Sequence, residues 1–182
     1  MAHRIETERL VLRRWRDEDR EPLARMHADP EVMRWLGRPP LSHEESDAYL
    51  DAFEENFEDH EFGAWAIERR CDGAWVGLAG MHRFTSEDHP LSPCVEIVWR
   101  QARPMWGNGY ISEAAKAALA DGFARVGLEE VFAWTAASNL RSQAVMERIG
   151  MTRDEACDFD SAALPVGHPL RRHLVFRISR KP

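Results

Sequence analysis

Apolar residues recur along the chain at two spacings, and these spacings predict an alternation of strands and helices. Leu10 and Leu12 alternate with polar residues and predict a first strand within 4–16. A capping box, Ser42 followed three residues later by Glu45, predicts a helix over about 42–60. Further helices are expected at about 17–28, 110–126 and 139–149, and further strands at about 63–69, 74–84, 94–101, 129–136, 151–159 and 170–179. This order predicts an α/β or α+β layered fold, a mixed sheet with helices on its faces.

The composition is that of one ordinary globular domain spanning 1–182. The 182 residues, 44% hydrophobic and 30% charged, suffice for one core but not for two. A net charge of −7 without an extended basic cluster argues against a nucleic-acid partner. Three widely spaced cysteines and scattered histidines predict reduced thiols and no metal site. A charged N-terminus and the lack of an apolar run of about 20 residues predict a cytoplasmic protein with no membrane partner.

Two glycines stand directly before a strong helix-forming run, in "RPMWGNGYISEAAKAAL" at 103–119. A helix N-terminus presents unpaired N–H groups and a partial positive charge, and glycine lets a ligand approach the backbone closely. Gly107, Asn108, Gly109, Tyr110 and Ile111 are therefore candidates for a phosphate cradle. The alternative is a tight turn from strand to helix with no ligand. The run is neither a P-loop nor a dinucleotide fingerprint, because the required lysine and third glycine are missing.

The run Pro-x-Trp-Gly-x-Gly-Tyr-x-x-Glu-Ala resembles the acyl-CoA pyrophosphate loop of the GNAT superfamily of N-acetyltransferases. More narrowly, the chain resembles the Rim-type branch, which acetylates ribosomal-protein N-termini; the segments that carry this likeness are 6–13, 29–33, 139–142 and 148–151. The resemblance implies a mixed, mostly antiparallel twisted sheet of about seven strands with helices on both faces. It also implies acetyl-CoA as cofactor and transfer of the acetyl group to a primary amine by direct attack in a ternary complex. The acceptor would be a protein N-terminus or a small amine.

Within this resemblance, further residues receive cofactor roles. Trp99, Arg100 and Gln101 would form an edge that splays from its neighbour strand and pairs with the pantetheine arm, while Trp106 belongs to the glycine loop. Asn139 would bond the cofactor arm and Ser142 the sulfur. The alternative for these last two residues is a helix cap and a polar residue of the first turn.

The amine must lose a proton before it attacks, and Glu96 is our candidate for the base. It lies in CVEIVW, an otherwise apolar strand, where burial would raise its pKa toward the range useful to a base. The alternative is a solvent-facing or arginine-paired carboxylate. His82 is expected at the surface; the alternative is that it faces the substrate cleft. Met146 stands where the superfamily often has a tyrosine that acts as the general acid, and methionine cannot donate a proton to the departing thiolate. A non-catalytic acyl-CoA sensor is therefore the second hypothesis.

The acceptor side is less defined by the sequence. The acidic balance favours cationic acceptors such as amino-terminal peptides or polyamines. The long connection 158–173 is expected to shape acceptor choice, because long loops often carry function. Sheet edges and this loop also leave a homodimer open. A third hypothesis, a nucleotide-phosphate binder unrelated to CoA, depends on the glycine loop alone.

Overall fold

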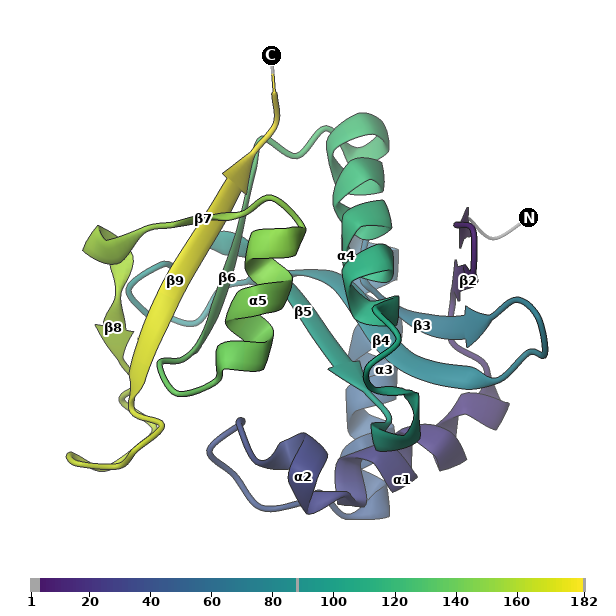
Figure 1. Ribbon diagram of the computed structural model, residues 1–182, viewed down its shortest axis with the longest axis horizontal. Coiled ribbons are helices and arrows are strands. Elements are labelled where there is room, and N and C mark those ends of the chain that lie inside the picture. The colour runs from purple at the N-terminus through teal and green to yellow at the C-terminus, as the bar shows by residue number, and fades with distance from the viewer. Residues whose placement is uncertain (1–3, 88, 182) are drawn as a thin grey trace.

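The computed structural model describes residues 4–87 and 89–181 and shows a mixed sheet of nine strands (Figure 1). The strands are β1 (Ile5–Glu6), β2 (Leu10–Arg13), β3 (Ala64–Arg69), β4 (Trp75–Phe84), β5 (Cys94–Gln101), β6 (Glu130–Ala136), β7 (Thr152–Arg153), β8 (Phe159–Asp160) and β9 (Arg172–Ser179). They pair in the order β1-β2-β3-β4-β5-β6-β9-β7, with β8 also on β9. All pairs are antiparallel except β5 with β6. The expected mixed, mostly antiparallel sheet is thus confirmed.

The sheet has more strands than the seven expected, because two expected strands are each divided. Residues 4–16 form the hairpin β1–β2, in which Ile5 lies opposite Leu12. Residues 151–159 form β7 and the start of β8, separated by a short 3-10 turn at Glu155–Cys157. Both divisions arise from short backbone turns inside the expected runs, one at residues 7–9 and the other at 154–158.

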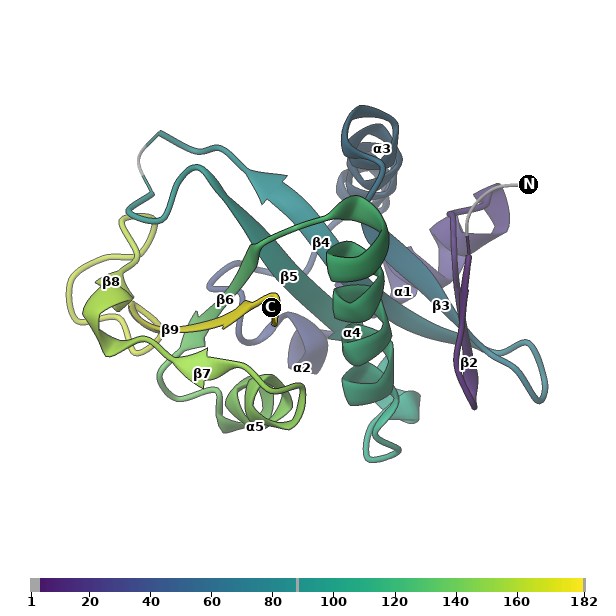
Figure 2. The ribbon, with the colours of Figure 1, turned by 90° about the horizontal axis from the view of Figure 1, so that it is seen from above.

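Helices lie on both faces of the sheet (Figure 2). They are α1 (Arg20–Ala28), α2 (Pro30–Met33), α3 (His43–His60), α4 (Tyr110–Asp121), which continues into a π-helical turn at Gly122–Val126, and α5 (Leu140–Arg148). Residues of α3 pack with Trp15 and Trp65 in one core cluster, and residues of α4 and α5 pack with Ile97 and Val131 in another. The capping box at the start of α3 is present as expected. None of the described helices has the length and apolar character needed to cross a membrane.

The feature that creates a site is the divergence of β5 from β6. Along its whole length β5 pairs with β4, from Cys94 opposite Phe84 to Gln101 opposite Gly77. Its pairing with β6 consists of a single bridge between Glu96 and Phe132. Beyond that bridge the far edge of β5 is unpaired, and the strand leads through a short 3-10 turn at Arg103–Met105 to the start of α4 (Figure 1).

Candidate active site

The glycine loop has the backbone conformation that only glycine adopts without strain. Gly107 has φ +81° and Gly109 has φ +75°. A Cβ on Gly107 would meet no atom within 4 Å, and one on Gly109 would meet only the Arg9 Nη2 atom at 3.7 Å. The left-handed backbone, rather than lack of space, therefore requires glycine at both positions.

The N-terminus of α4 is open. Gly109 is its N-cap and no side chain caps it. Ser42 caps α3 and Asn139 caps α5 through side-chain oxygens, whereas α1, which is as long as α5, also has no side-chain cap. The first N–H groups of α4 therefore have no side-chain acceptor and face outward with the positive end of the helix dipole. This is the geometry of an anion site.

Three side chains that the sequence assigned to the cofactor hold the loop in shape. Trp106 donates from Nε1 to the Gln101 carbonyl at 2.9 Å. Gln101 in turn donates from Nε2 to the Met105 carbonyl at 2.7 Å, and Asn108 donates from Nδ2 to the same carbonyl at 3.0 Å. These bonds leave the backbone amides of the loop, rather than these polar side chains, to contact a ligand.

Two arginines lie at the loop, and sequence reasoning gave neither a role. Arg9 donates from Nη1 to the Asn108 carbonyl at 2.9 Å and pairs with Glu113 at 2.6 Å. The Arg141 guanidinium carbon lies 4.9 Å from the centre of the Trp106 ring. Both are exposed cations beside an uncapped helix end. Arg9 comes from the bend between β1 and β2, about a hundred residues away in the chain, so no local pattern could have revealed it.

The alternation of β5 decides which backbone groups face the open edge. Ala102 donates from its backbone N–H to the Val76 carbonyl at 3.0 Å. In an antiparallel ladder of this register, Arg100 then turns its backbone groups toward β4 as well, while Trp99 and Gln101 turn theirs away from it. The Gln101 carbonyl is already taken by Trp106. The groups that this edge presents away from β4 therefore include the N–H and C=O of Trp99 and the N–H of Gln101.

Glu96 lies at the point where β5 and β6 separate, and it is 9% exposed. Its Oε2 atom lies 2.8 Å from Nε2 of His82, the residue directly opposite it on β4. Burial raises the pKa of Glu96, while the hydrogen bond and charge of His82 and the charge of Arg100 act to lower it. The His82 side chain is 30% exposed, so it is the more accessible member of the pair. The pairing depends on strand register, which the sequence did not disclose.

The Arg100 side chain lies on the same face of β5 as Glu96, four residues further on, and reaches α1 and α3. It donates from Nη1 to His27 Nε2 at 2.7 Å and lies 5.0 Å from the centre of the Tyr49 ring. His27 is completely buried, and its Nδ1 lies 2.9 Å from Ser46 Oγ. Arg100 was expected at the cofactor edge, but both its backbone and its side chain are directed elsewhere.

Comparison with known proteins agrees with this geometry. Residues 9–152 match the family described as the acetyltransferase (GNAT) domain. The chain belongs to this family. It is 26% identical over 151 residues to the N-acetyltransferase YoaA of Bacillus subtilis, whose own function is uncharacterized, covering 82% of this chain and 83% of that one. As a member of the GNAT family it is an acetyltransferase enzyme.

Solved structures show the same GNAT fold. An acetyltransferase of Agrobacterium tumefaciens superposes with a TM-score of 0.79 at 26% identity, covering 99% of this chain and 96% of that one. RimL, the ribosomal L7/L12 N-terminal acetyltransferase, was solved in complex with coenzyme A. It superposes with a TM-score of 0.78 at 15% identity, covering 97% and 98% of the two chains, and shows likeness of fold alone. The Rim-type resemblance is compatible with these neighbours.

Three residues of α5 show how this GNAT chain departs from the expected pattern. Asn139 is 6% exposed and its side chain accepts from the Ser142 N–H at 3.3 Å and donates to Thr135 at 2.9 Å. Its amide is therefore engaged as the cap of α5. The Ser142 side chain is half-buried in the first turn. Met146 is 2% exposed within the core, so this position supplies neither an acid nor a contact to solvent.

The connection 158–173 approaches the α2–α3 loop. A Cβ on Gly37 would meet Leu164 Cδ2 at 3.0 Å, so these two segments touch. Phe159 of the same connection belongs to an aromatic cluster with His89, Trp134 and His173. The connection therefore lies against elements on the Glu96 face of the sheet, where an acceptor would approach.

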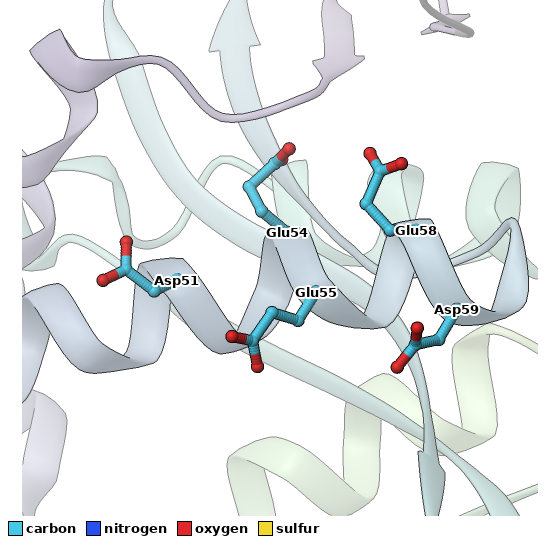
Figure 3. A pocket seen from close by; sticks show the side chains of 5 residues that line it. All are labelled: Asp51, Glu54, Glu55, Glu58 and Asp59. Atoms are coloured by element: carbon cyan, nitrogen blue, oxygen red, sulfur yellow. The ribbon is translucent and has the colours of Figure 1, made fainter.

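A surface hollow elsewhere on α3 has a different character (Figure 3). It is lined by five carboxylates, Asp51, Glu54, Glu55, Glu58 and Asp59. Arg14 pairs with Glu54 and Glu58, and Arg20 pairs with Asp51. Three of the five, Asp51, Glu54 and Glu58, are thus part of surface ion pairs, and the hollow is separate from the β5 edge.

Proposed function

We propose that this enzyme transfers the acetyl group of acetyl-CoA to a primary amine, carried by a protein N-terminus or a small molecule. The observation that carries the proposal is the continuous path from the unpaired edge of β5 to the uncapped start of α4. An extended thiol arm fits the first, and a pyrophosphate fits the second. We further propose that residues 1–182 form one transferase domain, which the single continuous sheet supports.

The residues present fit CoA by the chemistry of their donors. The amides of Gly107, Asn108, Gly109, Tyr110 and Ile111 would bond the pyrophosphate, and Arg9 and Arg141 add positive charge beside it. Trp99 and Gln101 would hold the pantetheine arm through their backbone groups. Arg100 takes no direct part in this edge, and Asn139 contributes only by holding the start of α5 and Ser142 in place.

Glu96 and His82 would remove the proton from the acceptor ammonium. An amine attacks only when neutral, while a lysine-type ammonium has a pKa of about 10 and an α-ammonium one of about 8. His82 is the exposed member and would contact the amine directly or through one water, with buried Glu96 orienting and stabilising its charged form. The pair resembles a base and its orienting carboxylate in other enzymes.

Acetyl-CoA, when bound, supplies a thioester carbonyl that is attacked directly in a ternary complex. The N–C bond would form and the C–S bond would break; one ammonium proton would pass to the His82–Glu96 pair before the attack, and the second proton lost by the nitrogen would pass to the departing thiolate. The free Trp99 N–H would stabilise the carbonyl oxygen, a contribution of roughly 3–4 kcal/mol in comparable sites. Ser142, in the first turn of α5, would bond the departing sulfur. Because a thiolate leaves readily, no tyrosine at Met146 is required.

The experiment that tests this function is acetyl-CoA turnover, followed as free thiol, against peptide N-termini, amino acids, polyamines and aminoglycosides. Calorimetric CoA binding is measured in parallel. Acceptor-dependent thiol release that is lost in Glu96→Gln, with CoA affinity retained, supports the proposal. Absence of CoA binding contradicts it.

A non-catalytic acyl-CoA sensor is the second candidate, and the buried Met146 is the observation that favours it. A sensor would bind CoA with the same loop and edge but would release no thiol with any acceptor. Turnover that depends on Glu96 excludes it. A homodimer remains a prediction, and sedimentation of the protein with and without CoA would test it.

A further inference from the structure

Arg100 is the exception among the half-buried arginines of this chain. Each of the others among the described residues has a carboxylate oxygen within 4.0 Å: Arg13, Arg14, Arg20, Arg69, Arg153 and Arg171. In the part of the chain that the structure describes, Arg100 has His27 and Tyr49 as its partners and no carboxylate oxygen within 4.0 Å, and Glu96 acts on it at longer range. Arginines are rarely buried without an anionic partner, because desolvation of an unpaired charge is costly.

The partners of Arg100 orient its guanidinium without cancelling its charge. His27 accepts from Arg100 Nη1, so its Nε2 carries no proton. Burial, followed by the charges of Arg100 and Arg38, lowers the pKa of His27 to about 3, and the ring is neutral at any working pH. The Tyr49 ring attracts the cation through its face. The result is an anchored cation whose charge remains available.

A second guanidinium lies at the same ring. The Arg38 guanidinium carbon is 5.9 Å from the centre of the Tyr49 ring, and Arg38 donates from Nη1 to the Tyr49 hydroxyl at 3.1 Å. Arg38 also pairs with Glu45 at 3.3 Å, in an exposed contact that water screens. Two cations placed around one phenol repel each other, and an oxyanion between them would remove that repulsion.

The position of Arg100 and Arg38 relates them to the acceptor. Arg100 and Glu96 project from the same face of β5, about 13 Å apart along the strand, and the arginine side chain is long enough to shorten that gap. Trp99, between them, carries the free edge that would hold the thiol arm. An acceptor whose amine reaches His82 and Glu96, and which extends along this face of β5, would have its remaining part beside Arg100 and Arg38.

We propose that Arg100 and Arg38 bind a carboxylate of the acceptor, so that the substrate class is an amine that also carries a carboxylate, as amino acids do. Guanidinium groups match the planar carboxylate through paired hydrogen bonds. The inference rests on the proposed transferase function. It departs from the cationic acceptors that the net charge favoured, because the local charge at this position is positive although the whole chain is acidic.

The test uses acceptors in matched pairs that differ only in the carboxylate. Glycine, β-alanine, 4-aminobutyrate, 6-aminohexanoate and phenylalanine are each compared with their primary amides. Binding is measured by calorimetry to the full chain saturated with CoA, which has no acetyl group to transfer, and turnover is measured with acetyl-CoA. We expect at least one acid to bind about 10-fold to 100-fold more tightly than its amide.

Variants connect that preference to the residues. Arg38→Gln is expected to abolish the preference for the acid, and the exposed position of Arg38 makes the substitution compatible with folding. Arg34→Gln is the matched control, because Arg34 is also exposed, stacks on Trp35 at 4.9 Å and pairs with Glu31 at 3.7 Å. The control should retain the preference. Arg100→Lys keeps the charge but loses the planar guanidinium that donates paired hydrogen bonds, so it should weaken binding of the acid and leave CoA affinity unchanged.

The outcomes separate this inference from the function on which it rests. Equal or weaker binding of every acid relative to its amide overturns the inference, as does binding by neither member of any pair. An equal loss of the preference in Arg34→Gln also overturns it. Preferential binding of acids without any turnover supports the carboxylate position and contradicts the transferase function. Turnover of amides or polyamines alone supports the function and overturns the carboxylate position.

Discussion

Replacement of Gly107 by alanine separates backbone strain from ligand binding, because the chain contains a matched control. Gly107 has φ +81° and Gly127 has φ +79°, and a Cβ at either position would meet no atom within 4 Å. A left-handed backbone costs an alanine about 1–2 kcal/mol. In a domain of this size each 1 kcal/mol lowers Tm by about 2–4 °C. Gly107→Ala and Gly127→Ala should therefore destabilise the free protein to the same extent.

The two variants should differ in their affinity for CoA. The methyl group of Gly107→Ala stands in the loop whose amides would face the pyrophosphate, whereas Gly127 ends the π-helical turn after α4. Loss of one hydrogen bond to a charged group costs about 1.5–3 kcal/mol, which corresponds to roughly a 10-fold to 100-fold rise in Kd. Calorimetric titration of CoA into both variants measures this difference, and thermal unfolding measures the shared strain. If Gly107→Ala bound CoA as tightly as Gly127→Ala, the loop would not be the pyrophosphate site.

Other predictions concern the base, the helix cap and the sheet. Glu96→Gln should lower kcat/KM by about 100-fold to 10,000-fold. In the wild type the rate should rise with pH, because the base must be deprotonated to act. The midpoint of this rising limb of the pH profile should lie above the ordinary pKa of a glutamate, because burial raises the pKa of Glu96; a midpoint at the ordinary value would contradict that effect of burial. His82→Leu should also lower kcat/KM, because His82 would contact the amine, and should move the pH limb of the remaining activity to higher pH, since the histidine lowers the pKa of Glu96; an unmoved limb would separate the two residues. Asn139→Ala should cost about 1–2 kcal/mol in urea unfolding through loss of the cap, and unchanged stability would argue against capping. Gly80→Ala should cost roughly 3 kcal/mol or more in thermal unfolding, because its Cβ would lie 2.0 Å from the Gly63 carbonyl oxygen, and a variant as stable as wild type would refute that clash.

Local sequence signals were sufficient for the elements whose causes are local. The capping box at Ser42 starts α3 where expected, since both partners lie within one helical turn. The glycine pair before α4 could be found for the same reason, because a left-handed backbone at a helix start favours glycine at that position. Glu96 stood out as a single carboxylate in an apolar strand, and burial of that strand followed from its composition.

Strand register and side-chain direction were outside the reach of local patterns. His82 was expected at the surface, yet the pairing of β4 with β5 places it opposite Glu96. Arg100 was assigned to the cofactor edge with its neighbours, but alternation along β5 turns its backbone toward β4 and its side chain toward His27. A shift of the register by one residue would exchange these assignments, and nothing in either strand alone sets it.

The sequence by itself thus determined the layered fold, the glycine-bounded helix start and the identity of the buried carboxylate, because each depends on residues close together in the chain. Only the tertiary structure decided which groups these features meet. It brought Arg9, near the N-terminus, to the glycine loop, and it left the edge of β5 beyond Glu96 unpaired with β6. It also placed the Arg100 side chain against His27 and Tyr49, neither of which is a carboxylate. The physical reason is that contacts between distant segments are set by strand pairing and by packing of the two helical layers, which residue patterns constrain only collectively.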